Sequence, residues 1–367
     1  MTDSAPPRGC SRHLLIIAVL FGVALVIVVA RSPDGVRNLL ANQQAMREGS
    51  EEARQIDSPD ALLSWIAAHP ERASLVVLDA DGTERLRLAG EAERPVAGLP
   101  ALWVAAAWAE QSASGRLDPS AVAPEALAVR RLPGTGGGDA DTLALSPEAL
   151  VRRTLAGDRA AESALVDRLG DQAVAERARR YGVAAPVPFE GMLLAWQDGD
   201  TTAAEAPALA RRLARDEAFR EAAVQRFYDE GFRLTLAEQR AAAGASLPRG
   251  SALSYARLLT DALSGTLSSP DASARFLDVL AVPDSLGGDA LRFGAKGGGF
   301  PGHLAFAAWV QTAEHPAGRS AVLILDDLPL GLFYHLSQTG LDSGLIFRLL
   351  TDEAFLDQRR GTGLRRD

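Results

Sequence analysis

The sequence predicts an α+β fold, in which a five-stranded antiparallel sheet is built from both ends of a 367-residue chain and is flanked by helices. An all-helical subdomain is expected beside the sheet and a transmembrane helix in front of it. Runs typical of strands occur near the start, at 74–90, and return only at 290–325. The stretch between them, at 115–245, is rich in Ala, Leu, Arg and Glu at helical spacing. Strands at both ends with helices between them imply one sheet shared by the two ends.

The composition excludes several classes of protein. Charged residues make up 23% and hydrophobic residues 47% of the chain, which is typical of a globular protein. The net charge of -9 supplies no phosphate-neutralising surface, so we expect no nucleic-acid partner. The single cysteine, Cys10, excludes an intrachain disulfide and a cysteine-based metal site. His303, His315 and His335 are far apart in sequence, so we expect no metal, and no motif indicates a cofactor.

The first element is an uncharged run of seventeen residues, Leu14 to Ala30, with Arg8 and Arg12 before it. This length is at the short end of what spans a bilayer, and the preceding arginines favour an N-in orientation. We therefore expect a signal anchor at 1–31 in the inner membrane, with the main domain periplasmic. A cleaved signal peptide is the alternative, although the run is longer than most signal-peptide cores.

The rest of the chain divides into a polar stalk at 32–57, a main domain at 58–357 and a tail at 358–367. The main domain contains the helical subdomain at about 99–285. Its first helix begins at Ser58-Pro59, because a hydroxyl cap followed by proline is a helix start.

The next elements follow from their local patterns. Asp81-Gly82 between two apolar runs predicts a hairpin over 74–90. The stretch 101–110 is apolar almost all round, so it predicts a buried helix with Trp103 and Trp108 in the core. The glycine-rich run 133–138 lacks the Gly-Lys-Ser/Thr ending of a phosphate-binding loop and is expected to be a flexible loop.

The C-terminal half alternates between the two kinds of element. Helices are expected at 251–264 and 270–280, strands at 290–295, 303–311 and 320–325, and one amphipathic helical stretch at 330–355.

Residues 59 to about 350 resemble the class A serine β-lactamases and the wider group of penicillin-recognising serine hydrolases. Four fragments carry the resemblance in the family order. They are ERPVAGLPALWVAAAWAEQSASGRLD, TLAGDRAAESALVDRLG, LSYARLLTDALSG and AKGGGFPGHLAFAAWV. The region 190–245 does not resemble the Ω-loop of that family and is interpreted as extra helix.

The resemblance implies a Ser-x-x-Lys motif at the start of the buried helix, because one helical turn then places the amine beside the hydroxyl. Gly98 stands at the position of the serine and Ala101 at that of the lysine. A shifted alignment does not restore the motif. Lys296 is the only lysine in the chain, and the residue three before it is Phe293.

The other two motifs are also incomplete. Gly157-Asp158-Arg159 matches Ser-Asp-Asn without the hydroxyl and the amide, and Lys296-Gly297-Gly298 matches Lys-Thr-Gly without the threonine. No asparagine follows Asn42, so the Glu-x-x-Leu-Asn element of deacylation is also incomplete. Removing a nucleophile or base from a comparable enzyme costs about six decades in rate. We therefore interpret the site as inactive toward β-lactams.

Binding is the function that remains. If the resemblance holds, Lys296, Gly297, Gly298, Asp158 and Arg159 line the old cleft and would attract a carboxylated or cell-wall-derived ligand. The alternative is that Lys296 pairs with Asp158 or is simply solvated.

Three hypotheses for the whole protein follow. The first is an anchored, inactive binding or scaffolding module near the cell wall. The second is an active hydrolase, an esterase or β-lactamase with a rewired site, in which Ser163, Ser251 or Ser254 would act with Asp158 or His303. The third is a structural module that its stalk ties to a membrane protein partner.

Overall fold

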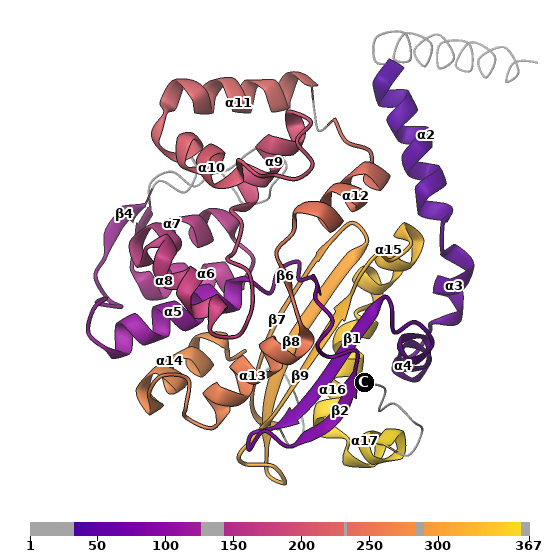
Figure 1. Ribbon diagram of the computed structural model, residues 1–367, viewed down its shortest axis with the longest axis vertical. Coiled ribbons are helices and arrows are strands. Elements are labelled where there is room, and N and C mark those ends of the chain that lie inside the picture. The colour runs from indigo at the N-terminus through magenta and orange to yellow at the C-terminus, as the bar shows by residue number, and fades with distance from the viewer. Residues whose placement is uncertain (1–32, 126–142, 231–232, 283–289, 361–367) are drawn as a thin grey trace, which may run out of the picture.

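The computed structural model describes residues 33–125, 143–230, 233–282 and 290–360 (Figure 1). The helices are α2 (Pro33–Arg47), α3 (Ser50–Gln55), α4 (Pro59–Ala68), α5 (Ala101–Ala113), α6 (Pro147–Leu155), α7 (Arg159–Leu169), α8 (Asp171–Arg179), α9 (Phe189–Gln197), α10 (Ala206–Arg215), α11 (Glu217–Glu230), α12 (Leu236–Ser246), α13 (Ala252–Leu263), α14 (Pro270–Leu280), α15 (Leu330–Thr339), α16 (Leu341–Thr351) and α17 (Glu353–Arg360). The strands are β1 (Ala73–Asp79), β2 (Glu84–Leu88), β3 (Arg94–Pro95), β4 (Ala123–Glu125), β5 (Leu143–Leu145), β6 (Arg249–Gly250), β7 (Ala290–Phe300), β8 (His303–Thr312) and β9 (Arg319–Leu325).

The predicted sheet is confirmed. Its five strands run in the order β2-β1-β9-β8-β7, and every neighbouring pair is antiparallel. The two chain ends meet where β1 pairs with β9, with Val76 opposite Val322. The hairpin and the three C-terminal strands therefore form one sheet, although about 200 residues separate them.

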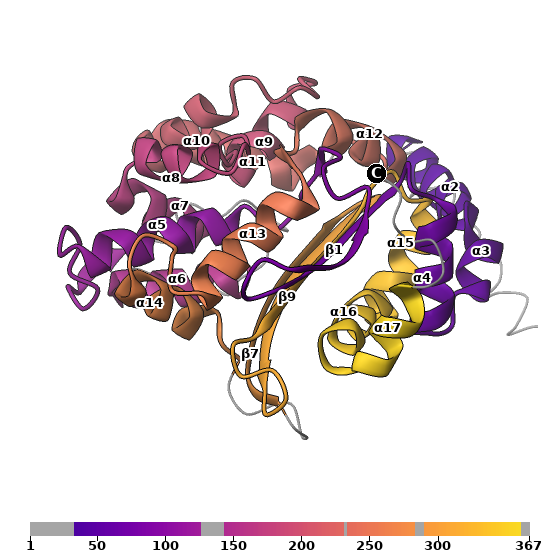
Figure 2. The same cartoon turned by 60° about the horizontal axis from the view of Figure 1, so that its bottom comes forward.

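Helices cover both faces of the sheet (Figure 2). The helical subdomain packs on one face through α13, and α4, α15 and α16 pack on the other. Successive residues of β9 alternate between the two cores: Val322 and Ile324 face α13, whereas Leu323 and Leu325 face the C-terminal helices. This alternation is the two-residue period of a strand, and burial on both faces explains why the strand reads as continuously apolar.

The ends of the helices follow their capping residues. Ser58 accepts a hydrogen bond from the Ala61 N–H and precedes proline, which confirms the predicted start of α4. The stretch 330–355, predicted as one helical element, is instead three helices. Gly340 ends α15 in the left-handed conformation (φ 65°), and Asp352 separates α16 from α17 in an extended one. The amphipathic pattern continues across both breaks because each helix buries one face on the same side of the sheet.

The predicted stalk lies against the main domain in its described part. Helix α3 contacts α15, and α2 contacts both α12 and α15. The Glu48 carbonyl accepts a hydrogen bond from the Gly331 N–H, and Ile56 is buried at 2% exposure. Residues 46–56 therefore contribute to the core beneath α15, whereas the predicted membrane segment lies outside the described residues. None of the described helices is long and apolar enough to span a bilayer.

The extra helical region predicted at 190–245 has a hydrophobic core of its own. Helices α9 to α12, called here the insert (residues 189–246), bury Met192, Trp196 and Phe227 among themselves. Phe300 at the end of β7 packs edge-on against Trp196, with ring centroids 5.2 Å apart. The insert is thus attached to the sheet at the strand that carries Lys296.

Candidate functional site

The turn that leads into α5 lies directly against strand β7. A Cβ atom at Gly98 would lie 2.9 Å from the Gly298 Cα and 3.0 Å from the Gly297 carbonyl oxygen. A Cβ at Gly298 would lie 2.6 Å from the Gly98 Cα. Because all these neighbours are backbone atoms, neither glycine leaves room for a side chain. The position at which the resemblance implies a nucleophilic serine is therefore closed by contact between two backbones.

The residue before Gly98 keeps a strained conformation. Ala97 has a φ of 42°, in the left-handed region that alanine rarely adopts. Backbone strain of this kind costs of order 1–3 kcal/mol and persists only where the surrounding structure enforces it. The turn therefore has a constrained backbone geometry, although Gly98 offers no side chain at the position of the family's serine.

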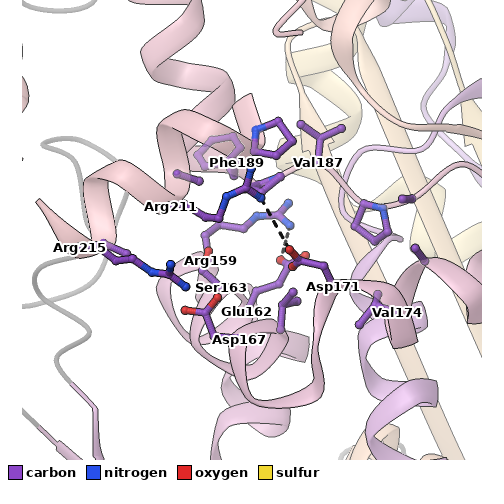
Figure 3. Close-up of a pocket in the computed structure, with 18 residues that line it drawn as sticks. Arg159, Glu162, Ser163, Asp167, Asp171, Val174, Val187, Phe189, Arg211 and Arg215 are labelled. Carbon is purple, nitrogen blue, oxygen red and sulfur yellow. Dashed lines mark hydrogen bonds and ion pairs between the residues drawn. The ribbon is translucent and has the colours of Figure 1, made fainter. Parts of the chain in front are cut away.

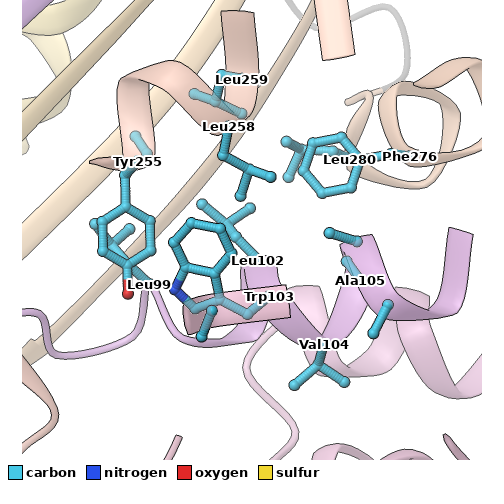
Figure 4. Packing of buried hydrophobic residues seen from close by; sticks show 14 of the residues in the cluster. Leu99, Leu102, Trp103, Val104, Ala105, Tyr255, Leu258, Leu259, Phe276 and Leu280 are labelled. Atoms are coloured by element: carbon cyan, nitrogen blue, oxygen red, sulfur yellow. The ribbon is translucent and has the colours of Figure 1, made fainter. Parts of the chain in front are cut away.

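Helix α5 behind this turn is packed as core. Ala101 is fully buried at 0% exposure, so a lysine at this position would have no space for its side chain. Trp103 and Trp108 are buried, as predicted, and the Trp103 ring lies 4.9 Å from that of Tyr255 (Figure 4). Leu258 of α13 and Phe276 and Leu280 of α14 pack against the same helix.

Lys296 lies on β7 and is only 6% exposed. Among the described residues, its ammonium group makes no hydrogen bond or ion pair. Burial and the repulsion of the nearby Arg159 lower the pKa of Lys296 to about 8, and Glu162 partly opposes this effect. Lys296 is therefore a buried amine on which Arg159 and Glu162 of α7 act in opposite directions.

Asp158 and Arg159 lie at the start of α7 and point to different partners. Asp158 caps the helix through the Ala161 N–H and binds Arg153 at 2.7 Å, so the suggested pairing of Asp158 with Lys296 is not found. Gly157 precedes them with a φ of 97°. Arg159 binds Glu162 at 2.7 Å, and its guanidinium lies 5.4 Å from the centre of the Phe189 ring in the insert.

Glu190 is a site residue that the sequence reasoning missed. It is the second residue of α9, is 3% exposed, and accepts a hydrogen bond from the Ser163 hydroxyl at 3.1 Å. Burial raises the pKa of Glu190 to about 7, Glu162 adds to the rise, and Ser163 and Arg159 oppose it. A signal was present, because Glu190 and Leu193 match the first and fourth positions of Glu-x-x-Leu-Asn, with Leu194 in place of the asparagine.

The three candidate serines are not assembled as predicted. Ser251 caps α13 through the Ser254 N–H, and the Ser254 hydroxyl donates to the Tyr181 carbonyl at 2.7 Å. His303 is engaged by the Asp326 carboxylate at 2.9 Å and the Arg240 carbonyl at 3.1 Å.

These contacts leave neither Ser251 nor Ser254 with a base among the described residues. Ser163 is bonded to a carboxylate, but the carboxylate belongs to Glu190 rather than to Asp158. Within the described part of the chain, no cluster of three or more His, Cys, Asp or Glu side chains is arranged to hold a metal ion.

The five-stranded sheet with helices on both faces, and the meeting of the turn before a buried helix with the strand carrying Lys296, define the architecture of the serine β-lactamases and penicillin-recognising hydrolases. A family model described as the β-lactamase enzyme family matches residues 59–324. The chain therefore belongs to the β-lactamase enzyme family.

Solved structures agree with this fold. A β-lactamase from Chitinophaga pinensis is similar with a TM-score of 0.52 and 14% identity, over 78% of this chain and 99% of that one. A β-lactamase from Sphaerobacter thermophilus has the same TM-score and 17% identity, over 77% and 97%. The chromosome-encoded β-lactamase of Vibrio parahaemolyticus also has a TM-score of 0.52, with 13% identity over 79% and 98%. No curated protein matches the sequence.

Proposed function

We propose that this protein is a catalytically inactive member of the β-lactamase enzyme family, anchored at the inner membrane and acting as a binding or scaffolding module near the cell wall. The observation that carries the proposal is the contact between Gly98 and Gly298, which leaves no space for a nucleophile at the start of α5. The absence of any Ser-x-x-Lys in the sequence supports it independently.

The expected loss of catalytic rate also supports the proposal. Losing the nucleophile or base of a comparable serine hydrolase costs about six decades, and losses within one catalytic unit do not add. Glu190 and Lys296, the two groups of the site whose pKa values are shifted toward neutrality, have no serine hydroxyl at the old nucleophile position. Without a serine to acylate, a buried carboxylate and amine have no acyl-enzyme intermediate to form or to hydrolyse.

The specific alternative is a rewired hydrolase at Ser163. It is favoured by the hydrogen bond from the Ser163 hydroxyl to the buried Glu190 carboxylate, a group able to take a proton near neutral pH. Ser163 lies within α7, and the peptide N–H groups in the middle of a helix are used in the helix itself. Such a serine lacks nearby backbone donors for an oxyanion, which disfavours this alternative.

The test is to incubate the full chain, purified in lipid nanodiscs, with a chromogenic cephalosporin, a fluorescent penicillin and a generic ester. We expect turnover no faster than with empty nanodiscs and no increase in the intact protein mass, because no activated serine is available. An active class A β-lactamase serves as the positive control. A stable acyl adduct on any serine contradicts the proposal, and an adduct on Ser163 that Ser163→Ala removes would establish the alternative.

A further inference from the structure

A pocket of about 230 Å³ lies between α7, α8, α10 and the segment 185–189 that leads into the insert (Figure 3). It lies outside the closed contact at Gly98. The residues of α7 that line it include Arg159, Glu162 and Ser163, which share one face of the helix at a spacing of three and four residues. The pocket therefore reaches Arg159, Glu162 and Ser163 from the side of the insert.

The floor of the pocket offers hydrogen-bond donors. Arg159 uses one guanidinium nitrogen on Glu162, and its remaining N–H groups have no hydrogen-bond partner among the described residues. The Ser163 hydroxyl donates its only proton to the Glu190 carboxylate, so it becomes a donor to a ligand once Glu190 is protonated and can itself donate to Ser163. Lys296 does not line the pocket, but its positive charge interacts electrostatically with Arg159 and Glu162. With Glu190 neutral, Arg159 and the more distant Lys296 together outweigh the single carboxylate of Glu162, so the floor favours an anion.

The walls of the pocket are apolar, and the positive and negative charges at its rim are equal in number. Val166, Val174 and Val187 line the walls together with Pro186 and Phe189. At the rim, Arg211 lies 3.7 Å from Asp171, and the side chains are 50% and 70% exposed, so this pair is weak.

Arg215 and Asp167 also line the pocket and carry opposite charges. Because the signs at the rim cancel, the floor decides which charge a ligand carries, and the walls require the rest of that ligand to be apolar.

We propose that this pocket binds a small apolar carboxylate, whose head group contacts Arg159 and Ser163 and whose chain lies along the valine and proline walls. The size of the pocket limits the ligand to about eight groups of water size, at ~30 Å³ each. This inference rests on the proposed binding role and assigns it a place and a ligand class.

The test uses a diazirine-bearing hexanoate as a photoaffinity probe on the full chain in nanodiscs, with empty nanodiscs as a blank. Labelled peptides are mapped by mass spectrometry, and affinity is measured by competition with hexanoate, hexylamine and hexanol. We expect labelling confined to 159–189 and 207–215 and displaced by hexanoate only. Labelling elsewhere, or equal displacement by hexylamine or hexanol, overturns the proposal.

Two variants test the geometry against a matched control. Arg159→Gln with Glu162→Gln removes the cation without leaving an unpaired carboxylate, and Ala175→Trp fills the pocket from the partly exposed side of α8. We expect each to weaken hexanoate at least tenfold. Arg212→Gln, on α10 but outside the pocket, should leave the affinity unchanged. Near-UV circular dichroism verifies that each variant is folded, and unchanged affinity in both folded pocket variants overturns the proposal.

The pH dependence gives a second readout. Arg159 and Glu162 on α7 are the charged groups that act on Glu190, together with the Ser163 hydroxyl. Glu190 gains its charge as the pH rises through about 7, and that charge would repel a bound carboxylate. Affinity for hexanoate should therefore fall roughly fourfold from pH 5.5 to 7.5 by proton linkage, and Glu190→Gln should abolish the dependence. A wild-type affinity independent of pH overturns this placement of the head group.

The failures of the two proposals are distinguishable. Absence of hexanoate binding together with absence of any acyl adduct removes the pocket proposal and leaves the inactive family member. A covalent adduct with a β-lactam or ester removes the proposed function, whatever the probe shows.

Discussion

Gly98 and Gly298 determine each other, because each Cα occupies the space in which a side chain of the other would begin. Neither glycine is required by a left-handed backbone, since neither has a positive φ. Their requirement is steric and arises from the approach of two elements about 200 residues apart in sequence. One glycine at the position of the family's serine removes a hydroxyl, whereas this pair of glycines also removes the space for any side chain between the two backbones.

The substitution Gly98→Ser tests this contact. The added Cβ would meet two backbone atoms at 3.0 Å or less, so the turn or the strand must move. We expect a loss of about 1–3 kcal/mol in the free energy of unfolding, measured in urea, and no gain of β-lactam turnover. Gly344→Ala is the matched control, because its Cβ would meet only the Pro59 Cγ at 4.0 Å and should not destabilise the protein. A Gly98→Ser protein as stable as the wild type would show that the cleft can open.

Glu190 and Lys296 show how burial acts on opposite charges. Burial raises the pKa of Glu190 to about 7 and lowers that of Lys296 to about 8, so both shifts favour the neutral form. Shifts of this kind are common where proton transfer is catalysed, but structural networks produce them too. Here Lys296 is two residues from Gly298, which closes the nucleophile position, and Glu190 is bonded to Ser163 on α7, so their perturbation supports binding chemistry better than catalysis.

At the scale of elements, the segment 32–57, predicted to be a stalk, differs most from its prediction. Its sequence at 32–57 is polar with sparse apolar residues, which predicts a solvated connector. In the structure, Ala53 and Ile56 belong to the core that α15 and α16 form on the sheet. The Asn42 side chain also accepts a hydrogen bond from the Leu236 N–H at the start of α12. A few well-placed residues therefore fix α2 and α3 to the main domain.

The substitution Ile56→Ala distinguishes a docked segment from a free stalk. Because Ile56 is 2% exposed, we expect it to lower the free energy of unfolding by about 2–5 kcal/mol. Leu40→Ala is the matched control, since Leu40 is 61% exposed and its loss should cost less than about 0.5 kcal/mol. Urea unfolding followed by tryptophan fluorescence measures both. Equal stability of the two variants would mean that the segment does not stay docked in solution.

At the scale of the whole molecule, a membrane segment at the predicted position would constrain how the domain is oriented. If residues 14–30 span the inner membrane, α2 follows almost directly, and its contacts with α12 and α15 hold that side of the domain toward the membrane. The pocket between α7, α8 and α10 would then open on a domain of fixed orientation rather than on one that swings on a flexible stalk.

The single cysteine provides a test of this topology. Cys10 precedes the predicted membrane segment, so a membrane-impermeant maleimide should label it only after spheroplasts are lysed. In Cys10→Ser with Val122→Cys, the new thiol replaces a residue that is 64% exposed and should be labelled in intact spheroplasts. The reverse pattern contradicts the N-in orientation. A mature protein whose mass lacks the first thirty residues indicates the cleaved signal peptide instead.

The amino-acid sequence alone was enough to predict the fold class and to show that the Ser-x-x-Lys motif is absent. Two strand-rich ends around a helical middle predict the sheet, and a single lysine with Phe293 three residues before it excludes Ser-x-x-Lys in any alignment. These conclusions depend on local pattern and on counting, and neither needs a knowledge of distant neighbours.

What occupies the positions of the missing catalytic groups depends on contacts that only the folded chain makes. Two of these contacts join residues far apart in the chain: Gly98 with Gly298, and Ser163 with Glu190. Ile56, which lies in the predicted solvated connector, is buried only because the folded domain covers it. The periodicity of apolar residues shows which face of an element is apolar but not which element covers that face. The packing partner depends on how all the elements are arranged in the fold. For the same reason, the pocket beside α7 exists only once the insert has docked on β7 and α7.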